Sequence, residues 1–183
     1  MDRIQFITKY CNGKILDCGG FEGEVHEILK KKFPDVVSID REKGADYQAD
    51  LNKDKLPFPD KEFDTIVAGE IVEHLVELSF FLRECRRVLK DDGVLLVTTP
   101  NADGLSSFLA GTIKRYNPNH VLMFNRGTLQ KYMEQLGFKC EMSWVNSFDI
   151  HNYPLWTRPF KYLTFLYPPW RLHICAVCRK NKK

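Results

Sequence analysis

The sequence lacks any run of apolar residues near the roughly 20 that a membrane-spanning helix requires. Its first residues, MDRIQFITKYCNGK, carry charges and no long apolar segment, so we expect no secretory signal. A composition of 44% hydrophobic and 28% charged residues is typical of a folded chain rather than a disordered one. We therefore expect a cytoplasmic protein, with 183 residues forming one domain over 1–183.

The sequence also lacks a second cysteine pair of the kind that binds zinc. It has six cysteines but a single C-x-x-C, Cys175 to Cys178. Residues three apart on a strand point to opposite faces, so we expect these two thiols to be ordinary strand packing. Without a secretory signal, all six cysteines are expected to be reduced.

Acidic residues are scarce in the C-terminal part of the chain. Residues 112–183 contain 12 Lys+Arg and 3 Asp+Glu, a balance of +9, whereas residues 1–111 contain 15 and 21, a balance of −6. The excess is consistent with an anionic partner, such as a membrane surface, nucleic acid or a phosphorylated substrate. A second interpretation is that the terminal RKNKK only keeps the tail soluble, and both interpretations stay open.

The most informative segment is KILDCGGFEGEVHEILKKK, over 14–32. β-prone residues lead to Asp17, glycines follow at Gly19, Gly20 and Gly23, and apolar residues then recur at helical spacing. This order predicts a strand, a glycine-rich turn and a helix, which lets a ligand lie against bare backbone at a helix N-terminus. Alone, the motif fits a tight turn without a ligand equally well.

Acidic residues end the next two predicted strands. DVVSID ends in Asp40, whose distance of about 20 residues from the turn suits hydrogen bonds to ribose hydroxyls. A short strand over 46–50 ends in Asp50, followed by Leu51, and alone Asp50 fits a helix or turn cap better. Prolines then force an extended crossing into a buried strand over 63–68.

Together these segments resemble class I S-adenosylmethionine-dependent methyltransferases of the small-molecule, ubiquinone-biosynthesis-like type. The order acid-x-Gly-x-x-x-Gly from Asp17 is similar to the family's first motif, acid-x-Gly-x-Gly-x-Gly, with Phe21 at the middle glycine. FPDKEFD and EIVEHL, before and after the 63–68 strand, are similar to the family's fourth-strand region. The resemblance is close over 14–101, extends more loosely to Phe138, and favours a methyltransferase over a nicotinamide enzyme.

The resemblance implies an α/β fold with a doubly wound, mostly parallel seven-stranded sheet, helices on both faces and a final antiparallel strand. It implies S-adenosyl-L-methionine as cofactor, lying on the glycine-rich turn with an acid on the ribose and another on the adenine. The expected cofactor-binding residues are Asp17, Gly19, Gly20, Phe21, Gly23, Asp40, Asp50, Leu51, Gly69 and Glu70.

Later segments predict the remaining elements. Apolar residues at helical spacing over 75–89 predict a helix, Asp91–Gly93 a turn, and GVLLVTTPN a fifth strand. HICAVCRK is expected to be the last strand, pairing antiparallel at one edge of the sheet. The segment near 150–171 interleaves Trp and Tyr with Arg and Lys, which predicts a substrate-facing insertion in peripheral contact with an anionic membrane. Completion of the core is the alternative.

Catalytic candidates follow the fourth strand. Glu70, Glu73 and His74 form E-x-x-E-H, and His120 comes from a later loop. Imidazole titrates near neutral pH, so His74 and His120 are the predicted catalytic residues, with one or the other acting as a general base without a metal. The same four residues resemble the metal site of small-RNA 3′-terminal 2′-O-methyltransferases, which keeps metal-assisted activation of a hydroxyl as an alternative.

The predicted function is S-adenosylmethionine-dependent O-methylation of a small or lipid-linked acceptor. One alternative is metal-assisted methylation of an RNA 3′ end, which is less favoured because the chain lacks an obvious RNA-binding appendage. A second is a non-catalytic, cofactor-binding regulatory module, for which Phe21 is the sequence hint. Neither the acceptor nor the oligomeric state follows from these residues.

Overall fold

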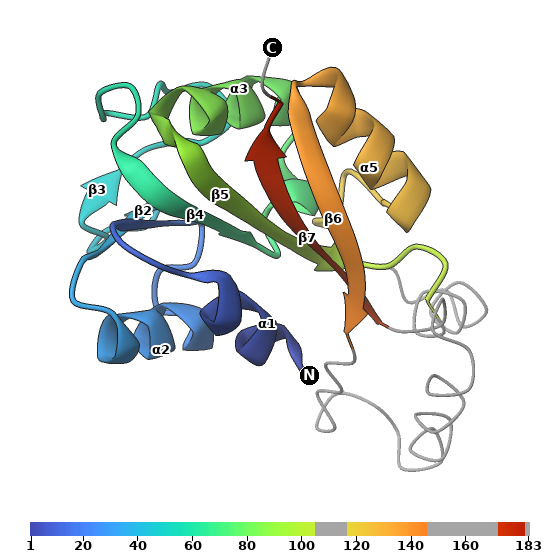
Figure 1. Cartoon of the computed structure of the whole chain (residues 1–183), viewed down its shortest axis with the longest axis horizontal. Helices are drawn as coiled ribbons and strands as arrows, with labels where there is room; N and C mark the ends of the chain where they lie inside the picture. Colours follow the sequence, from blue (N-terminus) through green and yellow to red (C-terminus); the bar gives the residue numbers. More distant parts are fainter. Residues whose placement is uncertain (105–116, 146–171, 182–183) are drawn as a thin grey trace.

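The computed structural model describes residues 1–104, 117–145 and 172–181. They form a seven-stranded sheet of order β3-β2-β1-β4-β5-β7-β6, with helices on both faces (Figure 1). The strands are β1 (Ile15–Cys18), β2 (Val36–Asp40), β3 (Tyr47–Gln48), β4 (Phe63–Gly69), β5 (Leu89–Pro100), β6 (Phe138–Val145) and β7 (His173–Lys180). The helices are α1 (Arg3–Tyr10), α2 (Glu24–Lys32), α3 (Leu78–Val88), α5 (Arg126–Gln135) and the short 3-10 helix η1 (Val72–His74). The predicted fold is confirmed.

The five strands β1 to β5 are parallel, and β1 lies between β2 and β4. The strand order therefore reverses at β1, and the connections on either side of it leave the sheet in opposite directions. In open α/β sheets a ligand lies at the carboxyl ends of the strands at such a reversal point. The glycine-rich turn follows β1 directly, so the predicted binding loop stands at the position that the topology favours.

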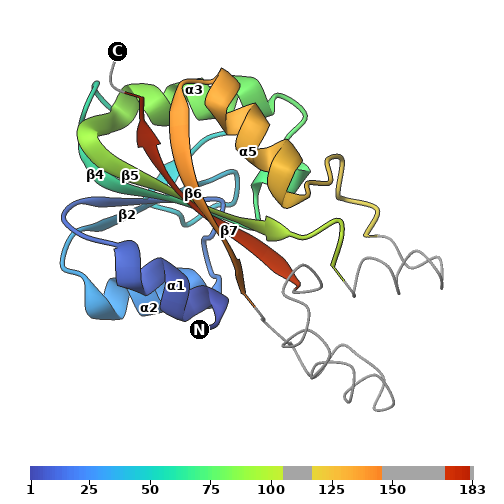
Figure 2. The ribbon, with the colours of Figure 1, turned by 45° about the vertical axis from the view of Figure 1, so that its right-hand side comes forward.

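Two apolar cores flank the sheet, one under each helical layer. Figure 2 shows the two layers, with α3 and α5 on one face and α1 and α2 on the other. Leu78, Phe81, Leu82 and Cys85 of α3 are buried with Leu129 of α5 on one face. On the other face α1 and α2 pack against the sheet, with Phe6, Ile7 and Leu29 fully buried. Strands covered on both sides need apolar residues at successive positions, which explains the near-continuous burial of β1 and β4.

The predicted turn at Asp91–Gly93 is wrong, because these residues belong to β5. Phe63 pairs with Leu89 and Thr65 with Val94, so a two-residue step along β4 faces a five-residue step along β5. The intervening residues form an irregularity within the strand. Polar residues next to a glycine are as typical of a bulge as of a turn, and only the pairing distinguishes them.

The last strand is antiparallel as predicted, but its predicted place at an edge is wrong. β7 pairs with both β5 and β6, so β6 is the edge strand. β7 is correspondingly buried over most of its length, from Ile174 to Cys178. A strand inserted between two neighbours satisfies both rows of its backbone hydrogen-bonding groups, and nothing in its sequence specifies which two strands it separates.

The prediction of six reduced cysteines is also wrong for one pair. Cys140 and Cys178 stand opposite each other on β6 and β7, with Cα atoms 4.1 Å apart, and their sulfur atoms are bonded. The two residues are 38 apart in the sequence, so only the strand pairing brings them together. Cys175 lies in the core on the other face of the sheet from Cys178, as its spacing predicts.

The aromatic segment near 150–171, predicted to face the substrate and the membrane, lies outside the described residues. Among the described helices, none combines the length and the apolar character needed to cross a membrane.

Candidate active site

The glycine-rich turn between β1 and α2 is built so tightly that side chains do not fit at its glycines. Gly19 has a φ of +72°, and a Cβ atom there would lie 2.6 Å from Cδ1 of Ile71. A Cβ atom at Gly20 would lie 2.9 Å from both carboxylate oxygens of Asp17, and one at Gly23 would lie 2.9 Å from the Gly20 carbonyl oxygen. The turn therefore presents bare backbone next to the residues that follow β4, which is the cradle that a cofactor needs.

Asp17 supports this turn from beneath. The residue is 1% exposed, and its Oδ2 atom lies 3.0 Å from Nδ1 of His26 on α2. A buried carboxylate requires such a partner, since an isolated charge is costly to bury. Asp17 thus joins the end of β1 to α2 and holds the turn between them, a supporting role in the described conformation.

Phe21, at the position of the family's middle glycine, turns toward the loop after β2. Its ring edge would lie 3.0 Å from a Cβ atom at Gly44, and its ring centroid is 6.1 Å from that of His26. Gly44 itself has a φ of +108°. The absence of a side chain at Gly44 leaves room for the Phe21 ring. Gly44 thus accommodates the large side chain that stands at the position of the family's middle glycine.

The predicted adenosine-binding acids lie at the ends of β2 and β3, one strand and two strands from β1. Asp40 ends β2, and its Oδ1 atom accepts the Glu42 N–H at 3.1 Å. The Oδ1 atom of Asp50 accepts the Asn52 N–H at 3.0 Å, so it caps the turn that follows. This local bond matches the turn-cap interpretation of Asp50, while Leu51 is buried next to it.

Gly69 and Glu70 end β4 beside the glycine-rich turn. Glu70 has a φ of +56°, a left-handed conformation that is uncommon for a residue with a side chain and clusters at functional sites. Its Oε2 atom lies 3.3 Å from Nε2 of His173, and its Oε1 atom lies 3.8 Å from a guanidinium nitrogen of Arg3. Burial opposes ionisation, but His173 and Arg3 outweigh it and lower the pKa of Glu70.

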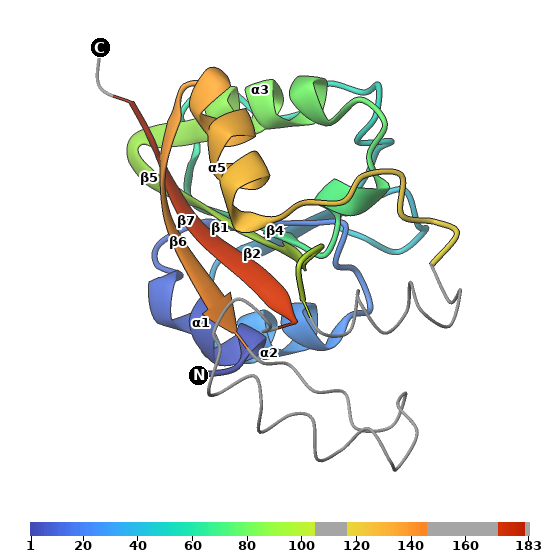
Figure 3. The ribbon, with the colours of Figure 1, turned by 90° about the vertical axis from the view of Figure 1, so that its right-hand side faces the viewer.

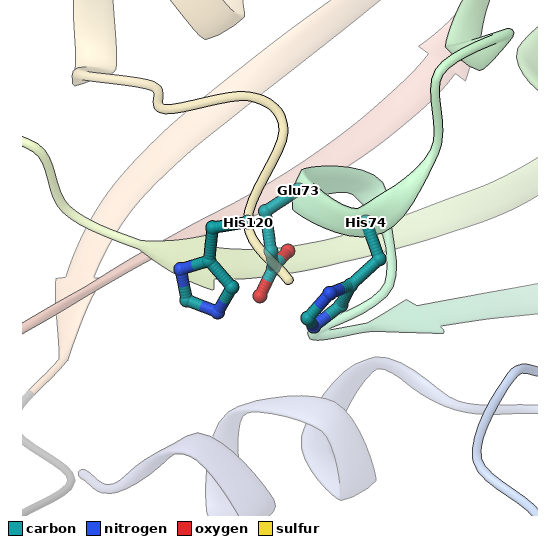
Figure 4. A group of neighbouring side chains, drawn as sticks. All are labelled: Glu73, His74 and His120. Atoms are coloured by element: carbon teal, nitrogen blue, oxygen red, sulfur yellow. The ribbon is translucent and has the colours of Figure 1, made fainter. Parts of the chain in front are cut away.

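Glu73, His74 and His120 form a second group, shown in Figure 4. The acid and His74 come from η1, and His120 comes from the segment before α5. The two imidazole rings lie edge to face with their centroids 4.8 Å apart. One ligand atom from each residue lies within 4.8 Å of the others, close enough for a divalent cation to join them. Glu70 turns toward Arg3 and His173, so the structure brings together three of the four predicted residues.

Hydrogen bonds fix the tautomers of the two histidines differently. Nδ1 of His74 lies 2.9 Å from the Asn119 carbonyl oxygen, which only accepts, so Nδ1 carries a proton and, in the neutral ring, Nε2 holds the lone pair. Nε2 of His120 lies 3.0 Å from the side-chain nitrogen of Asn117, whose side-chain oxygen accepts the Asn119 N–H. The Asn117 amide therefore donates to His120 and occupies the lone pair of that ring. Burial and the nearby His74 lower the pKa of His120, which keeps it neutral.

Glu73 connects this group to the sheet. It is 2% exposed, its Oε2 atom accepts the Thr99 hydroxyl at 3.0 Å, and its carbonyl oxygen accepts the N–H groups of Val121 and Leu122. Burial, and then the negative charge of Glu70, raise the pKa of Glu73 to about 8. The carboxyl group is thus predominantly protonated at neutral pH, and its backbone holds the segment that carries His120.

Sequence reasoning missed Arg3, Thr99, His173 and the two asparagines that orient the histidines. Arg3 and His173 come from opposite ends of the chain, and no local motif marks them. The asparagines stand beside His120 in NPNH, a polar pattern that indicates a turn and not the partners of its side chains.

The carboxyl ends of β1, β2 and β4 thus carry the glycine-rich turn, the acid Asp40 about 20 residues after that turn, and a group of ionisable side chains. This combination is typical of a nucleotide-cofactor site in a Rossmann-like sheet. Gly19, Gly20 and Gly23 keep the turn free of side chains, which suits a cofactor that contacts backbone.

Comparison with known proteins specifies the family. A family model described as "Methyltransferase domain" matches residues 2–142. A "Probable S-adenosylmethionine-dependent methyltransferase" of Mycolicibacterium smegmatis is 31% identical over 148 residues, 75% of this chain and 56% of the relative. A "Ubiquinone biosynthesis O-methyltransferase" of Bradyrhizobium diazoefficiens is 30% identical over 110 residues, 53% of this chain and 44% of the relative. The chain spans about half the length of these curated relatives.

The crystal structure of an S-adenosylmethionine-dependent methyltransferase from Archaeoglobus fulgidus superposes with a TM-score of 0.73. It is 18% identical, and the match covers 97% of this chain and 91% of that one, which supports the fold alone. The chain belongs to the class I S-adenosylmethionine-dependent methyltransferase family, and its cofactor class is S-adenosyl-L-methionine. The resemblance inferred from the sequence is confirmed.

Proposed function

We propose that this chain is an O-methyltransferase that transfers a methyl group from S-adenosylmethionine to a hydroxyl of a small or lipid-linked acceptor. The observation that carries the proposal is the contact of Nδ1 of His74 with the Asn119 carbonyl oxygen, which leaves Nε2 of the neutral ring to accept a proton. The names of relatives that methylate oxygen in ubiquinone biosynthesis favour the same acceptor atom.

The cofactor would rest on Gly19, Gly20 and Gly23, with Asp40 on its ribose and the ends of β4 beside its methionine part. When bound, it would supply a methyl group on a positively charged sulfur, which would keep the electron pair of the broken C–S bond and leave as a neutral thioether. His74 takes the proton of the acceptor hydroxyl on Nε2, and the oxygen keeps the electron pair of the broken O–H bond for its attack. His120 remains neutral, so it does not oppose the positive charge that His74 acquires.

Methyl transfer to a panel of phenols and lipid-linked hydroxyl compounds tests this proposal. We expect His74→Ala to lower turnover by about 10²–10⁴-fold, the usual contribution of a general base. Asn119 acts on His74 through its backbone carbonyl, so Asn119→Ala retains this bond and serves as the matched control. Full activity of His74→Ala would contradict the role of His74.

Metal-assisted transfer, including transfer to an RNA 3′ end, is the second candidate. The closeness of the ligand atoms of Glu73, His74 and His120 supports it. A chelator followed by added Mg²⁺, Mn²⁺ or Zn²⁺ separates the candidates, with an RNA 3′ end included among the acceptors. We expect activity to be indifferent to the chelator. Loss and recovery of activity would establish the metal.

A non-catalytic cofactor-binding module is distinguished by turnover. Binding of S-adenosylmethionine without transfer to any acceptor would favour that module, whereas turnover excludes it. We also propose that residues 1–183 act as one domain and that the aromatic segment near 150–171 contacts the acceptor and an anionic membrane surface. Its basic and aromatic residues support this contact.

A further inference from the structure

A groove of about 690 Å³ lies at the end of the sheet where β4 and β5 begin, opposite the candidate active site at the carboxyl ends of the parallel strands. Its walls come from the residues before β4, the C-terminal part of α3, the start of β5 and the end of β7. Figure 3 shows the end of β7 together with α3 and α5 at the side of the molecule away from α1 and α2. Methyl transfer uses none of these residues.

Positive charge dominates this groove. Asp60 and Asp91 are its acidic residues, and its basic residues are Lys61, Arg83, Arg86, Arg87 and Lys180. Asp60 is paired with Arg87 at 2.9 Å. Asp91 is shared by Lys61 at 2.6 Å and Lys180 at 3.4 Å, so one carboxylate faces two ammonium groups. The terminal basic run therefore contributes Lys180 to a built surface.

Arg83 and Arg86 carry the uncompensated charge. They stand three residues apart on α3, which places both on one side of the helix. In the described part of the chain neither guanidinium is paired with a carboxylate. Arg86 donates through Nε to the Gly137 carbonyl oxygen at 3.4 Å, and a Cβ atom at Gly137 would lie 3.0 Å from that same Nε. Gly137 thus leaves room for the Arg86 guanidinium, which this hydrogen bond holds through Nε alone.

We propose that this groove binds a phosphorylated small molecule of nucleoside diphosphate size, with its phosphate groups on Arg83 and Arg86. Guanidinium groups match phosphate oxygens in a planar, two-bond geometry that ammonium groups do not provide. The volume lies within the range of small-molecule sites, roughly 300–1,000 Å³. Leu136 and Asn181 in the wall offer an apolar and an amide surface to the organic part of the ligand.

Calorimetry on the full chain tests the proposal, with S-adenosylhomocysteine present in excess to fill the cofactor site. The probes are uridine diphosphate, pyrophosphate and uridine at constant ionic strength. Both phosphorylated probes are expected to bind and uridine is not. Arg83→Gln and Arg86→Gln should each weaken binding at least tenfold. Arg86→Lys keeps the charge but loses the planar geometry of the guanidinium. This variant should therefore lose less binding affinity than Arg86→Gln.

The matched control is Lys32→Gln, which removes one exposed positive charge from α2 on the other face. It should change binding less than twofold. Equal affinity of wild type and the Arg83→Gln/Arg86→Gln double variant would overturn the proposal, as would absence of binding by both phosphorylated probes. Binding of a single-stranded RNA oligonucleotide without binding of uridine diphosphate would assign the charge to nucleic acid instead. Arg83 is exposed, so Arg83→Gln leaves the fold intact and keeps the test decisive.

Discussion

Gly19→Ala should destabilise the protein by about 2–5 kcal/mol. A residue with a side chain in the left-handed region costs about 1–2 kcal/mol, and the φ of Gly19 is +72°. The added methyl group would also lie 2.6 Å from Cδ1 and 2.7 Å from Cγ1 of Ile71. Such overpacking should lower the free energy of unfolding by about 1–3 kcal/mol more.

A double-mutant cycle separates these two costs. Ile71→Ala removes the colliding atoms but leaves the left-handed backbone unchanged, so the double variant Gly19→Ala/Ile71→Ala should lose less stability than the two single variants predict together. The favourable coupling is expected to be about 1–3 kcal/mol, the size of the steric part. The remaining cost of Gly19→Ala is then the backbone cost.

Urea unfolding followed by circular dichroism measures the free energy of unfolding of the variants. Gly127→Ala on α5 is the matched control, because its Cβ atom would meet only Oδ1 of Asn125 at 3.6 Å, and it should stabilise the protein by about 0.4–1 kcal/mol. Calorimetry with S-adenosylmethionine should show weaker binding by Gly19→Ala. A Gly19→Ala variant as stable as wild type would refute the cradle geometry.

Three further predictions concern the cofactor, pH and membranes. Asp40→Ala should weaken S-adenosylmethionine binding by about 1.5–3 kcal/mol, the range for hydrogen bonds to a charged group; calorimetry measures it, and unchanged affinity would remove Asp40 from the site. Arg87 lowers the pKa of Glu84 below its ordinary value of 4.5, so this stabilisation is present above that pH and is lost as the pH falls through the folded-state pKa. Glu84→Gln should therefore cost about 1.5–3 kcal/mol at neutral pH and progressively less in acid, as urea unfolding at several pH values measures, whereas a constant difference would refute the pairing. The chain should co-sediment with anionic but not neutral vesicles at low salt, and Trp156→Ala or Lys161→Glu should abolish this binding. Each basic residue near an anionic surface contributes about 1 kcal/mol to such binding. Protein that stays in the supernatant under every condition would contradict membrane contact.

Features that depend on residues a few positions apart could be predicted from the sequence. Gly19, Gly20 and Gly23 mark the turn because the backbone needs freedom from side chains there, and helical spacing over 75–89 indicates a buried apolar stripe. These signals depend on neighbours a few residues away. The helix α3 and the strands β1, β2 and β4 accordingly appear where they were predicted.

The candidate active site was predicted only in part. The E-x-x-E-H pattern correctly predicts that Glu73 and His74 follow the end of β4. It also predicts that Glu70 belongs to the same group of side chains, and this rests on the pattern alone. In the structure the Glu70 carboxylate pairs instead with Arg3 and His173, and the backbone of Glu70 is left-handed. The direction of a side chain depends on that dihedral angle and on partners from distant segments, which no local pattern contains.

The sequence by itself determined the family, the order of elements and the glycine-rich turn, since these rest on contiguous residues and their periodicity. Only the tertiary structure decided that β7 lies between β5 and β6, that Cys140 meets Cys178, and which histidine keeps a free lone pair. Each of these results depends on pairing between segments far apart in the chain. Strand register and hydrogen-bond partners are properties of the whole sheet, because every strand chooses among neighbours that its own residues do not specify.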